Sequence, residues 1–170
     1  EKITSNIVSL FPRNYSIIIT DSTASVGGNT IAFLLNKNIS LVNSIEINKK
    51  RFEMLQNNIN IKKKYIIGKY NLYNCSYLDI SNTLKEDVIF MDPPWGGPEY
   101  YKNSNVKLFL DNIHLVEIVN TLFYKKTVLS YIILKVPKNF NISNFKSILT
   151  PTLIIEKFLF SDELKKMDFF

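Results

Sequence analysis

The sequence predicts one α/β domain built on a doubly wound, mostly parallel sheet. Short apolar, β-branched runs alternate with amphipathic helical segments, which is the pattern of parallel strands joined by helices. Acidic residues stand at the ends of three runs, at Asp21, Glu46 and Asp92. Four of the five glycines form two doublets, Gly27-Gly28 and Gly96-Gly97, in loops that follow predicted strands. Because sheets of this kind bind ligands outside the carboxyl ends of their strands, we expect the functional site there.

The spacing of the hydrophobic residues predicts where each strand and helix lies. Residues 15–21 are apolar and β-branched, as in a buried parallel strand, whereas residues 48–59 carry apolar side chains at three- and four-residue intervals, as in a helix. A similar recurrence predicts a helix over residues 105–123. In order, the expected elements are strand 15–21, loop 22–28, helix 29–35, strand 39–47, helix 48–59, strand 70–77, strand 87–91, helix 105–123, strand 128–136, helix 142–149 and closing strands 152–160 and 166–170.

Composition excludes several classes of protein. The 170 residues are 46% hydrophobic and 13% aromatic, enough for a buried core and unlike a disordered chain. No apolar run approaches the roughly 18–20 residues of a membrane helix, so we expect no membrane association. A single cysteine and a single histidine exclude an internal disulfide, a zinc cluster of thiolates and a His-rich metal site. The net charge of +6 permits an anionic partner such as nucleic acid.

The ends of the chain carry two further expectations. No charged-then-apolar leader opens the sequence, so nothing marks it for secretion and we expect a reducing, intracellular compartment. The sequence begins at Glu1 without methionine, which is typical of a processed product or an excised domain. We therefore expect one domain, residues 1–170, that lacks upstream residues.

The first glycine doublet closes a loop of small residues, Ser22 to Gly28, which would let the backbone approach a ligand closely. Glu46 follows about 20 residues after the loop, where a carboxylate can accept hydrogen bonds from both ribose hydroxyls. No Gly-Lys-[Ser/Thr] follows, so the loop is not a phosphate-binding P-loop, and the full G-x-G-x-x-G pattern is also absent. Taken alone, the loop is equally consistent with a structural role.

The second doublet follows Asp92-Pro93-Pro94-Trp95. The prolines lack N–H groups and restrict φ, so they hold the Asp92 carboxylate and the Pro93 carbonyl as a rigid pair of acceptors. Such a pair suits an exocyclic NH₂ group on a planar base, whose lone pair it would aim at an electrophilic methyl group. Trp95 offers a face for stacking a base, and cation–π attraction would favour a cationic base such as N7-methylguanine. A core tryptophan at a loop is the alternative for Trp95.

These motifs together resemble the trimethylguanosine synthase family, S-adenosylmethionine-dependent enzymes that methylate N2 of an N7-methylated guanosine cap. The resemblance rests on Val26-Gly-Gly-Asn-Thr-Ile31, Ile45-Glu-Ile-Asn48, Asp92-Pro-Pro-Trp-Gly-Gly-Pro98 with Tyr100, and Val136-Pro-Lys-Asn139. It implies a Rossmann-like class I methyltransferase fold with a C-terminal antiparallel hairpin, S-adenosylmethionine as cofactor, capped RNA as partner, and no metal. It also leaves room for further domains or subunits N-terminal to Glu1.

The resemblance also implies a role for individual residues. Asp21 and the backbone of Ser25 and Gly27 would face the methionine part of the cofactor. Asn29 and Thr30 would support that loop. Glu46 would bind the ribose, and Ser76 and Tyr77 would neighbour the adenine. For the substrate, the implied residues are Asp92 and Pro93 at the N2 amine, Trp95 on the base, Pro98 and Tyr100 in the cap pocket, and Lys138 and Asn139 at the phosphates.

Departures from the family pattern leave alternatives open. Ser25 replaces a glycine in the cofactor loop and Ser76 an aspartate at the adenine, and both changes bear on cofactor affinity. Asp92 stands where several members carry serine, and Lys138 replaces an arginine, which loses bidentate phosphate contact but keeps the charge. One alternative is an N6-adenine methyltransferase on DNA or RNA, because Asp-Pro-Pro-Trp suits that amine too. Another is a cap-binding or scaffold domain that keeps the fold without turnover.

Overall fold

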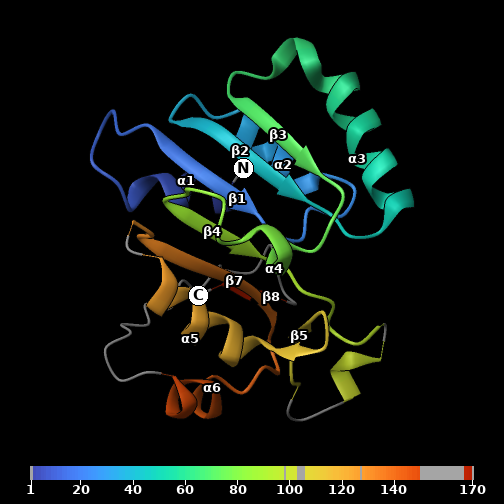
Figure 1. Ribbon diagram of the computed structural model, residues 1–170, viewed down its shortest axis with the longest axis vertical. Helices are drawn as coiled ribbons and strands as arrows, with labels where there is room; N and C mark the ends of the chain where they lie inside the picture. The colour runs from blue at the N-terminus through green and yellow to red at the C-terminus, as the bar shows by residue number, and fades with distance from the viewer. Residues whose placement is uncertain (1, 98, 103–105, 127, 150–166, 170) are drawn as a thin grey trace. The chain divides into compact units, whose positions relative to one another are not determined.

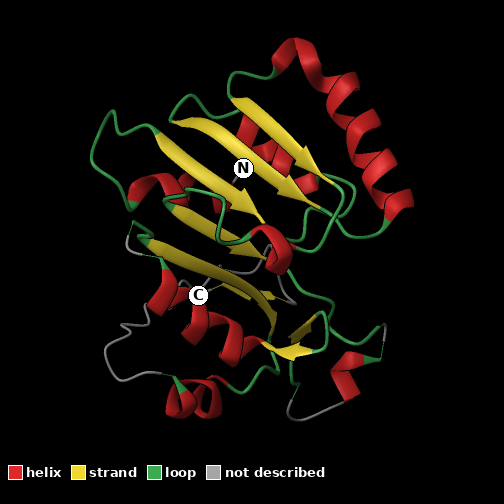
Figure 2. Cartoon of the chain, viewed as in Figure 1, coloured by secondary structure: helices red, strands yellow, loops and turns green. Residues whose placement is uncertain are grey.

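The computed structural model describes residues 2–97, 99–102, 106–126, 128–149 and 167–169. The chain divides into two compact units, the first formed by Glu1–Phe90 with Val128–Tyr131 and the second by Met91–Thr127 with Ile132–Phe170. Both units combine helices and strands, which confirms the predicted α/β class (Figure 2). In the described part of the chain, no helix combines the length and apolar character needed to cross a membrane.

The first unit is built on a parallel sheet. Its described strands lie in the order β3 (Lys69–Tyr73), β2 (Ile39–Ile45), β1 (Ile17–Asp21) and β4 (Val88–Met91), and the last residue of β4 begins the second unit. All three pairings are parallel, and the four arrows in Figure 1 point the same way. This is the mostly parallel arrangement that the sequence predicts, so the strands end at one edge of the sheet.

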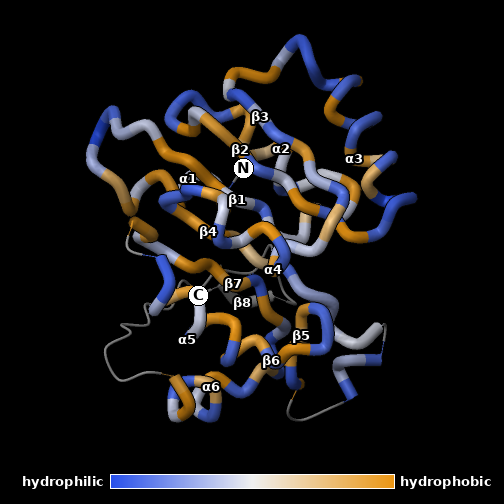
Figure 3. Tube along the Cα trace, viewed as in Figure 1, coloured by the Kyte–Doolittle hydropathy of each residue, from blue (hydrophilic) through white to orange (hydrophobic). Residues whose placement is uncertain are grey.

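Helices and strands of the first unit share an apolar core. Its helices are α1 (Lys2–Ser9), α2 (Gly28–Leu34), α3 (Lys49–Lys62) with the 3₁₀ turn η1 (Lys63–Tyr65), and α4 (Tyr77–Ile80). Along α3 the hydropathy alternates, as a helix half-covered by the core requires (Figure 3). Leu55 and Ile59 from α3 and Phe33 from α2 are buried, and the Phe33 ring meets Phe90 edge-on at 5.4 Å.

The second unit contains two antiparallel pairs. Its described elements are η2 (Tyr100–Lys102), β5 (Phe109–Leu110), β6 (Ile113–His114), α5 (Leu115–Lys125), β7 (Tyr131–Pro137, of which Tyr131 belongs to the first unit), α6 (Ile142–Ile148) and β8 (Met167–Phe169). β8 pairs antiparallel with β7, in register at Lys135 and Phe169, so the predicted closing strand over 166–170 is confirmed over three residues. The predicted strand 152–160 lies outside the described residues.

The predicted helix over 105–123 is wrong over residues 106–114. The structure has the hairpin β5–β6 there, and α5 begins only at Leu115. Asp111 and Asn112 form the two-residue turn with φ values of 50° and 64°, a left-handed geometry that Asp and Asn tolerate and that matches the twist of a hairpin. His114 then begins the helix, since its Nδ1 accepts a hydrogen bond from the Val116 amide at 3.4 Å.

The predicted strand 70–77 is also too long. β3 ends at Tyr73, and Tyr77 opens the short helix α4 instead. The reason is local: the Ser76 hydroxyl accepts from the Leu78 amide at 3.1 Å, an N-cap that starts a helix at this point.

Candidate functional site

Asp21, the last residue of β1, anchors the start of α2. Its side chain is fully buried, and its Oδ2 accepts a hydrogen bond from the Thr30 hydroxyl at 2.6 Å. The same hydroxyl lies 3.0 Å from the hydroxyl of Ser44 on β2. Three elements that end or begin at this sheet edge are therefore joined by one buried polar cluster. The roles that the resemblance implies, support of a cofactor loop by Asn29 and Thr30 and contact of Asp21 with the methionine group, stay predictions.

The loop between β1 and α2 contains two residues with positive φ. Gly27 has φ of 94° and Ser25 has φ of 50°, a conformation that L side chains seldom adopt. A Cβ on Gly27 would stand 2.6 Å from Cδ1 of Leu55, whereas a Cβ on Gly28 would meet nothing within 4 Å. The two glycines thus have different roles. Gly27 is required by its positive φ and by the close approach of Leu55, whereas Gly28 leaves open space beside the start of α2.

Glu46 ties the loop to the end of β2. Its side chain is buried, with Oε2 accepting from the Ser25 amide at 2.9 Å and Oε1 accepting from the Asn48 amide at 2.7 Å. A carboxylate offers about four acceptor positions, so these two hydrogen bonds leave capacity for hydroxyl donors. These acceptor positions fit the ribose of S-adenosylmethionine, whose hydroxyl groups would donate to Glu46.

Two asparagine side chains that were not predicted for the site brace this region. Asn58 on α3 donates to the Val26 carbonyl at 2.8 Å, and Asn74 after β3 donates to the Glu46 carbonyl at 2.7 Å. Both join segments more than 25 residues apart in the chain. Asparagine is abundant throughout the sequence, so neither residue stood out: Asn58 is near the end of the predicted helix 48–59, and Asn74 falls inside the predicted strand 70–77.

Ser76 and Tyr77, expected beside the adenine, have other partners in the structure. The Ser76 hydroxyl caps α4, as described above. Tyr77 is 1% exposed and donates its hydroxyl to Oε1 of Glu86 at 3.2 Å; burial first, and then Glu86, raise the pKa of Tyr77 far above that of an ordinary tyrosine. The ring of Tyr77 therefore belongs to the core. The prediction that Ser76 and Tyr77 neighbour the adenine is not tested by these contacts and stays a prediction.

The acceptor loop, residues 92–97, directly follows β4 and lies in the second unit. Pro93 is buried and Pro94 is exposed, which places the first proline of the pair against the protein. Gly96 and Gly97 have φ values of 93° and 85°, so both positions of the second doublet require glycine. A Cβ on either would meet nothing within 4 Å, so the reason is backbone conformation and not packing.

Asp92 forms an ion pair that sequence reasoning missed. Its Oδ2 lies 2.6 Å from the ammonium nitrogen of Lys135 on β7, and the two side chains are only 22% and 15% exposed. The same nitrogen lies 5.9 Å from the centroid of the Trp95 ring. A signal existed in the sequence, because Lys135 is the one charged residue in an otherwise apolar strand, Tyr131-Ile-Ile-Leu-Lys-Val-Pro137.

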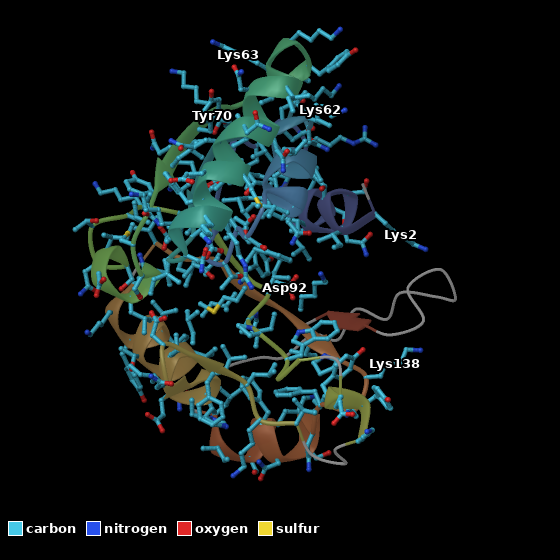
Figure 4. All side chains as sticks on the ribbon, turned by 90° about the vertical axis from the view of Figure 1, so that its right-hand side faces the viewer. Lys2, Lys62, Lys63, Tyr70, Asp92 and Lys138 are labelled. Carbon is cyan, nitrogen blue, oxygen red and sulfur yellow. The ribbon has the colours of Figure 1, made fainter. Side chains whose placement is uncertain are left out.

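Trp95 is held by an aromatic neighbour. The rings of Trp95 and Tyr100 meet edge-on with centroids 5.1 Å apart, and Asn139 donates to the Tyr100 carbonyl at 2.8 Å. Asn139 therefore stabilises the segment that carries Tyr100, and its contact with a phosphate stays a prediction. Lys138 is exposed, and Figure 4 shows its position together with that of Asp92. Pro98, expected in the cap pocket, lies outside the described residues.

The residues predicted to bind the cofactor lie in the first unit, and those predicted to bind the substrate lie in the second. Residues 16–157 match the model of a family described as RNA cap guanine-N2 methyltransferase. The chain belongs to this family. The match includes both glycine doublets, Glu46 and the acceptor loop, so it covers the residues on which the resemblance was based.

A viral protein is similar to most of the chain. Over 133 residues the chain is 36% identical to the uncharacterized protein L320 of Acanthamoeba polyphaga mimivirus, which is 78% of this chain and 51% of that protein. This family member therefore spans about half the length of the viral protein.

Solved structures show the fold at low sequence identity. An rRNA methylase from Streptococcus thermophilus superposes with a TM-score of 0.60 at 11% identity, over 98% of this chain and 90% of that one. A conserved hypothetical protein from Streptococcus pyogenes gives a TM-score of 0.57 at 18% identity, over 97% and 91%. The fold of this family member is that of the class I methyltransferases, the class that uses S-adenosylmethionine.

Proposed function

We propose that this domain transfers a methyl group from S-adenosylmethionine to the exocyclic N2 amine of an N7-methylguanosine cap on RNA. The observation that carries the proposal is the acceptor loop: a carboxylate, a buried proline and a tryptophan, in a chain whose family is described by this reaction. The Gly-Gly-Pro that follows and the Gly-Gly-Asn-Thr loop favour the cap guanine over an adenine amine.

Each half of the reaction draws on its own set of residues. Glu46 and the backbone of the 22–28 loop would hold the cofactor, with Gly28 leaving space beside it. Bound S-adenosylmethionine supplies a methyl group on a positively charged sulfur. Asp92 and the Pro93 carbonyl would accept hydrogen bonds from the two amine protons, which orients the nitrogen lone pair at the methyl group. The nitrogen–carbon bond would form as the sulfur–carbon bond breaks, S-adenosylhomocysteine would leave, and the amine would release one proton to the Asp92 carboxylate or to water.

Trp95 and Lys138 would bind the rest of the cap. The indole face of Trp95 would stack on the base, and Tyr100 fixes the indole from its edge. Lys138 is exposed on the turn after β7 and would attract the triphosphate bridge and the RNA backbone. Capped RNA is therefore the partner that we propose.

The test is methyl transfer followed by mass spectrometry on three substrates in parallel: N7-methylguanosine cap dinucleotide, unmethylated cap dinucleotide and an adenine-containing single strand. We expect a mass gain on the N7-methylguanosine cap dinucleotide alone, and none on the unmethylated cap dinucleotide or the adenine strand. Gain on adenine would move the assignment to the N6 enzymes. No gain on any substrate, with the protein extended upstream as well, would leave a binding or scaffold domain.

Two variants separate the acceptor loop from general effects of charge removal. Asp92→Ala should lower kcat by about a hundredfold, since a positioned polar group at the reacting atom contributes roughly that much. Glu53→Ala removes an exposed carboxylate on α3 and should leave kcat within about twofold, because surface substitutions have small effects. Equal activity in the two variants would refute the role assigned to Asp92.

A further inference from the structure

One stretch of the chain carries its excess of positive charge. Residues 47–75 contain seven basic residues and one acidic residue, a net charge of +6 that equals the net charge of the whole chain. The rest of the chain has as many acidic as basic side chains, and so do residues 150–166, which lie outside the described ranges. In the structure the basic stretch forms α3, η1 and β3, all in the first unit. We therefore expect an anionic partner to bind this part of the first unit.

The basic side chains of this stretch are exposed to solvent. They are Lys49, Lys50, Arg51, Lys62, Lys63, Lys64 and Lys69. None of them forms an ion pair with a carboxylate in the described part of the chain. Of the carboxylates nearest in sequence, Glu53 is exposed on α3 without such a pair, Glu46 is buried and accepts from backbone amides, and Asp79 lies beyond β3 on α4. The seven positive charges are therefore accessible to an anion.

The stability of α3 does not explain the cations at its start. The first turn holds Lys49, Lys50 and Arg51 and no acidic residue, although the positive end of a helix dipole favours acidic side chains. The Asn48 side chain caps the helix by accepting from the Arg51 amide at 3.1 Å, so the cap does not need these cations. Charges kept against the local preference of a helix indicate a function, which here is the attraction of an anion.

A second basic cluster lies at the other end of α3. Lys62 ends the helix and Lys63 and Lys64 follow in η1, and Figure 4 shows Lys62 and Lys63 at this end. Cations also stabilise the C-terminal end of a helix, so the distinguishing feature of this cluster is an exposed ring. Tyr65 is 55% exposed, and the Lys64 ammonium nitrogen lies 4.8 Å from its ring centroid. Cations beside an exposed aromatic ring are typical of surfaces that bind single-stranded nucleic acid, where phosphates contact the cations and a base stacks on the ring.

The two clusters lie along one polar side of α3. Lys49, Gln56 and Lys63 follow at seven-residue intervals, which places them on the same face of the helix, and all three are exposed. Asn57 and Asn60, between the clusters, are exposed amides that can donate to phosphates, whereas a helix on a membrane needs a continuous apolar face. At about 1.5 Å per residue, the clusters are about 20 Å apart. A linear polyanion can therefore reach both of them, whereas a compact anion can contact only one.

We propose that the α3 basic surface, formed by residues 49–51 at one end and 62–65 at the other, binds the single-stranded body of an RNA. The choice of RNA as the polyanion rests on the proposed function. The contacts are made to phosphates and to a stacked base, so they require neither the cap nor S-adenosylmethionine and do not depend on the RNA sequence. The α3 basic surface would thus add affinity for a long RNA that a cap dinucleotide does not receive.

Binding is measured by fluorescence anisotropy with an uncapped oligouridine of about 20 nucleotides, labelled at its 3′ end, in the absence of cofactor. For single strands, each phosphate contact contributes about 0.7 to the slope of log affinity against log salt concentration. Six cationic contacts predict a slope of magnitude about 4, so raising potassium chloride from about 50 to 200 mM should weaken binding about 300-fold.

Two triple variants test the two ends separately. Each should reduce the slope to about 2 and weaken binding at the lower salt concentration by at least about tenfold. Alanine is a strong helix former, so both variants should fold, which circular dichroism verifies; if one does not, glutamine at the same three positions carries the same expectation. One variant combines Lys49→Ala, Lys50→Ala and Arg51→Ala, and the other combines Lys62→Ala, Lys63→Ala and Lys64→Ala.

The matched control removes three exposed lysines elsewhere, by Lys85→Ala, Lys125→Ala and Lys146→Ala, so its net charge equals that of each test variant. It should keep the slope, and its Kd should stay within about threefold of the parent value. Equal weakening in control and test variants would show that only the net charge matters and would overturn the inference. Unchanged binding in both test variants, or no salt-dependent binding by the parent, would also overturn it. So would binding to vesicles of phosphatidylserine and phosphatidylcholine in place of RNA, which would assign the surface to a membrane.

The transfer assay separates this inference from the proposed function. The variant at residues 62–64 should methylate the cap dinucleotide at the parent rate, because that substrate has no RNA body, and should lose about tenfold in kcat/KM on a capped RNA. A parent protein that binds oligouridine as expected but methylates no cap would refute the proposed function and leave the α3 basic surface intact. A parent protein that methylates the cap dinucleotide but does not bind oligouridine would refute this inference alone.

Discussion

Replacing Gly27 by alanine tests why the first glycine doublet exists. Gly27 stands at the N-cap of α2 with φ of 94°, and a Cβ there would lie 2.6 Å from Cδ1 of Leu55. Leu55 is fully buried, so it cannot turn into solvent to avoid the new methyl group. The substitution therefore combines backbone strain with overpacking of the core.

The two costs can be estimated separately. An L-residue in the left-handed region costs roughly 1–2 kcal/mol, and forcing an extra carbon into a packed core costs about 1–3 kcal/mol. The free energy of unfolding should therefore fall by about 2–5 kcal/mol in Gly27→Ala. For a chain of this length, a loss near 3 kcal/mol lowers Tm by about 6–12 °C.

Urea unfolding followed by circular dichroism, with a thermal melt beside it, measures both quantities. Gly28→Ala is the matched control, because its φ is not positive and its Cβ would meet nothing within 4 Å. Alanine exceeds glycine in helix propensity by about 1 kcal/mol, so this control should be neutral or slightly stabilising. A loss below about 0.5 kcal/mol in Gly27→Ala, or equal losses in both variants, would refute the reasoning.

A double-mutant cycle identifies the clash itself. Leu55→Ala alone should cost about 2–5 kcal/mol through the cavity that it leaves. In the double variant the methyl group introduced by Gly27→Ala would enter the space vacated by Leu55, so the combined loss should be smaller than the sum by about 1–3 kcal/mol. Additive losses would show that the cost of Gly27→Ala comes from the backbone alone.

Two further predictions concern the neighbouring residues. Ser25→Gly should be at least as stable as the parent, since glycine adopts φ of 50° without strain. Ser25→Val should lower the free energy of unfolding by about 2 kcal/mol, because β-branched residues avoid that region. Urea unfolding measures both variants, and equal stability of the two would contradict this prediction. Burial, followed by the charge of Asp79, raises the pKa of the Cys75 thiol. Alkylation of this single cysteine should therefore be slow at neutral pH and accelerate only above the ordinary thiol pKa of about 8.5, and a rate midpoint below that value would show the shift to be absent.

Much of the scaffold could be predicted because its signals are local. The run Tyr15–Asp21 has the composition of a buried parallel strand, and the stripe of Leu55 and Ile59 has the period of a helix, so the alternation of strands and helices follows from short stretches of sequence. The glycine doublets also marked true special positions, since Gly27, Gly96 and Gly97 all have positive φ. Each of these depends on the conformation of a few neighbouring residues.

The errors arose where two local signals competed. The spacing of apolar residues over 105–123 is helical, yet the turn formed by Asp111 and Asn112 is stable enough to begin a hairpin before α5. In the same way, the N-cap formed by Ser76 begins a helix within the predicted strand, and Tyr77 is therefore helical and buried in the core. Periodicity alone does not determine which of two such signals prevails.

The sequence by itself determined the class of fold, the two loops that carry the candidate site, and the acceptor motif from Asp92 to Trp95. Only the tertiary structure decided which partners those residues have. Lys135 reaches Asp92 across 43 residues, and Asn74 reaches the carbonyl of Glu46 across 28. The physical reason is that such contacts depend on which strands become neighbours and in what register, and a single stretch of sequence encodes neither.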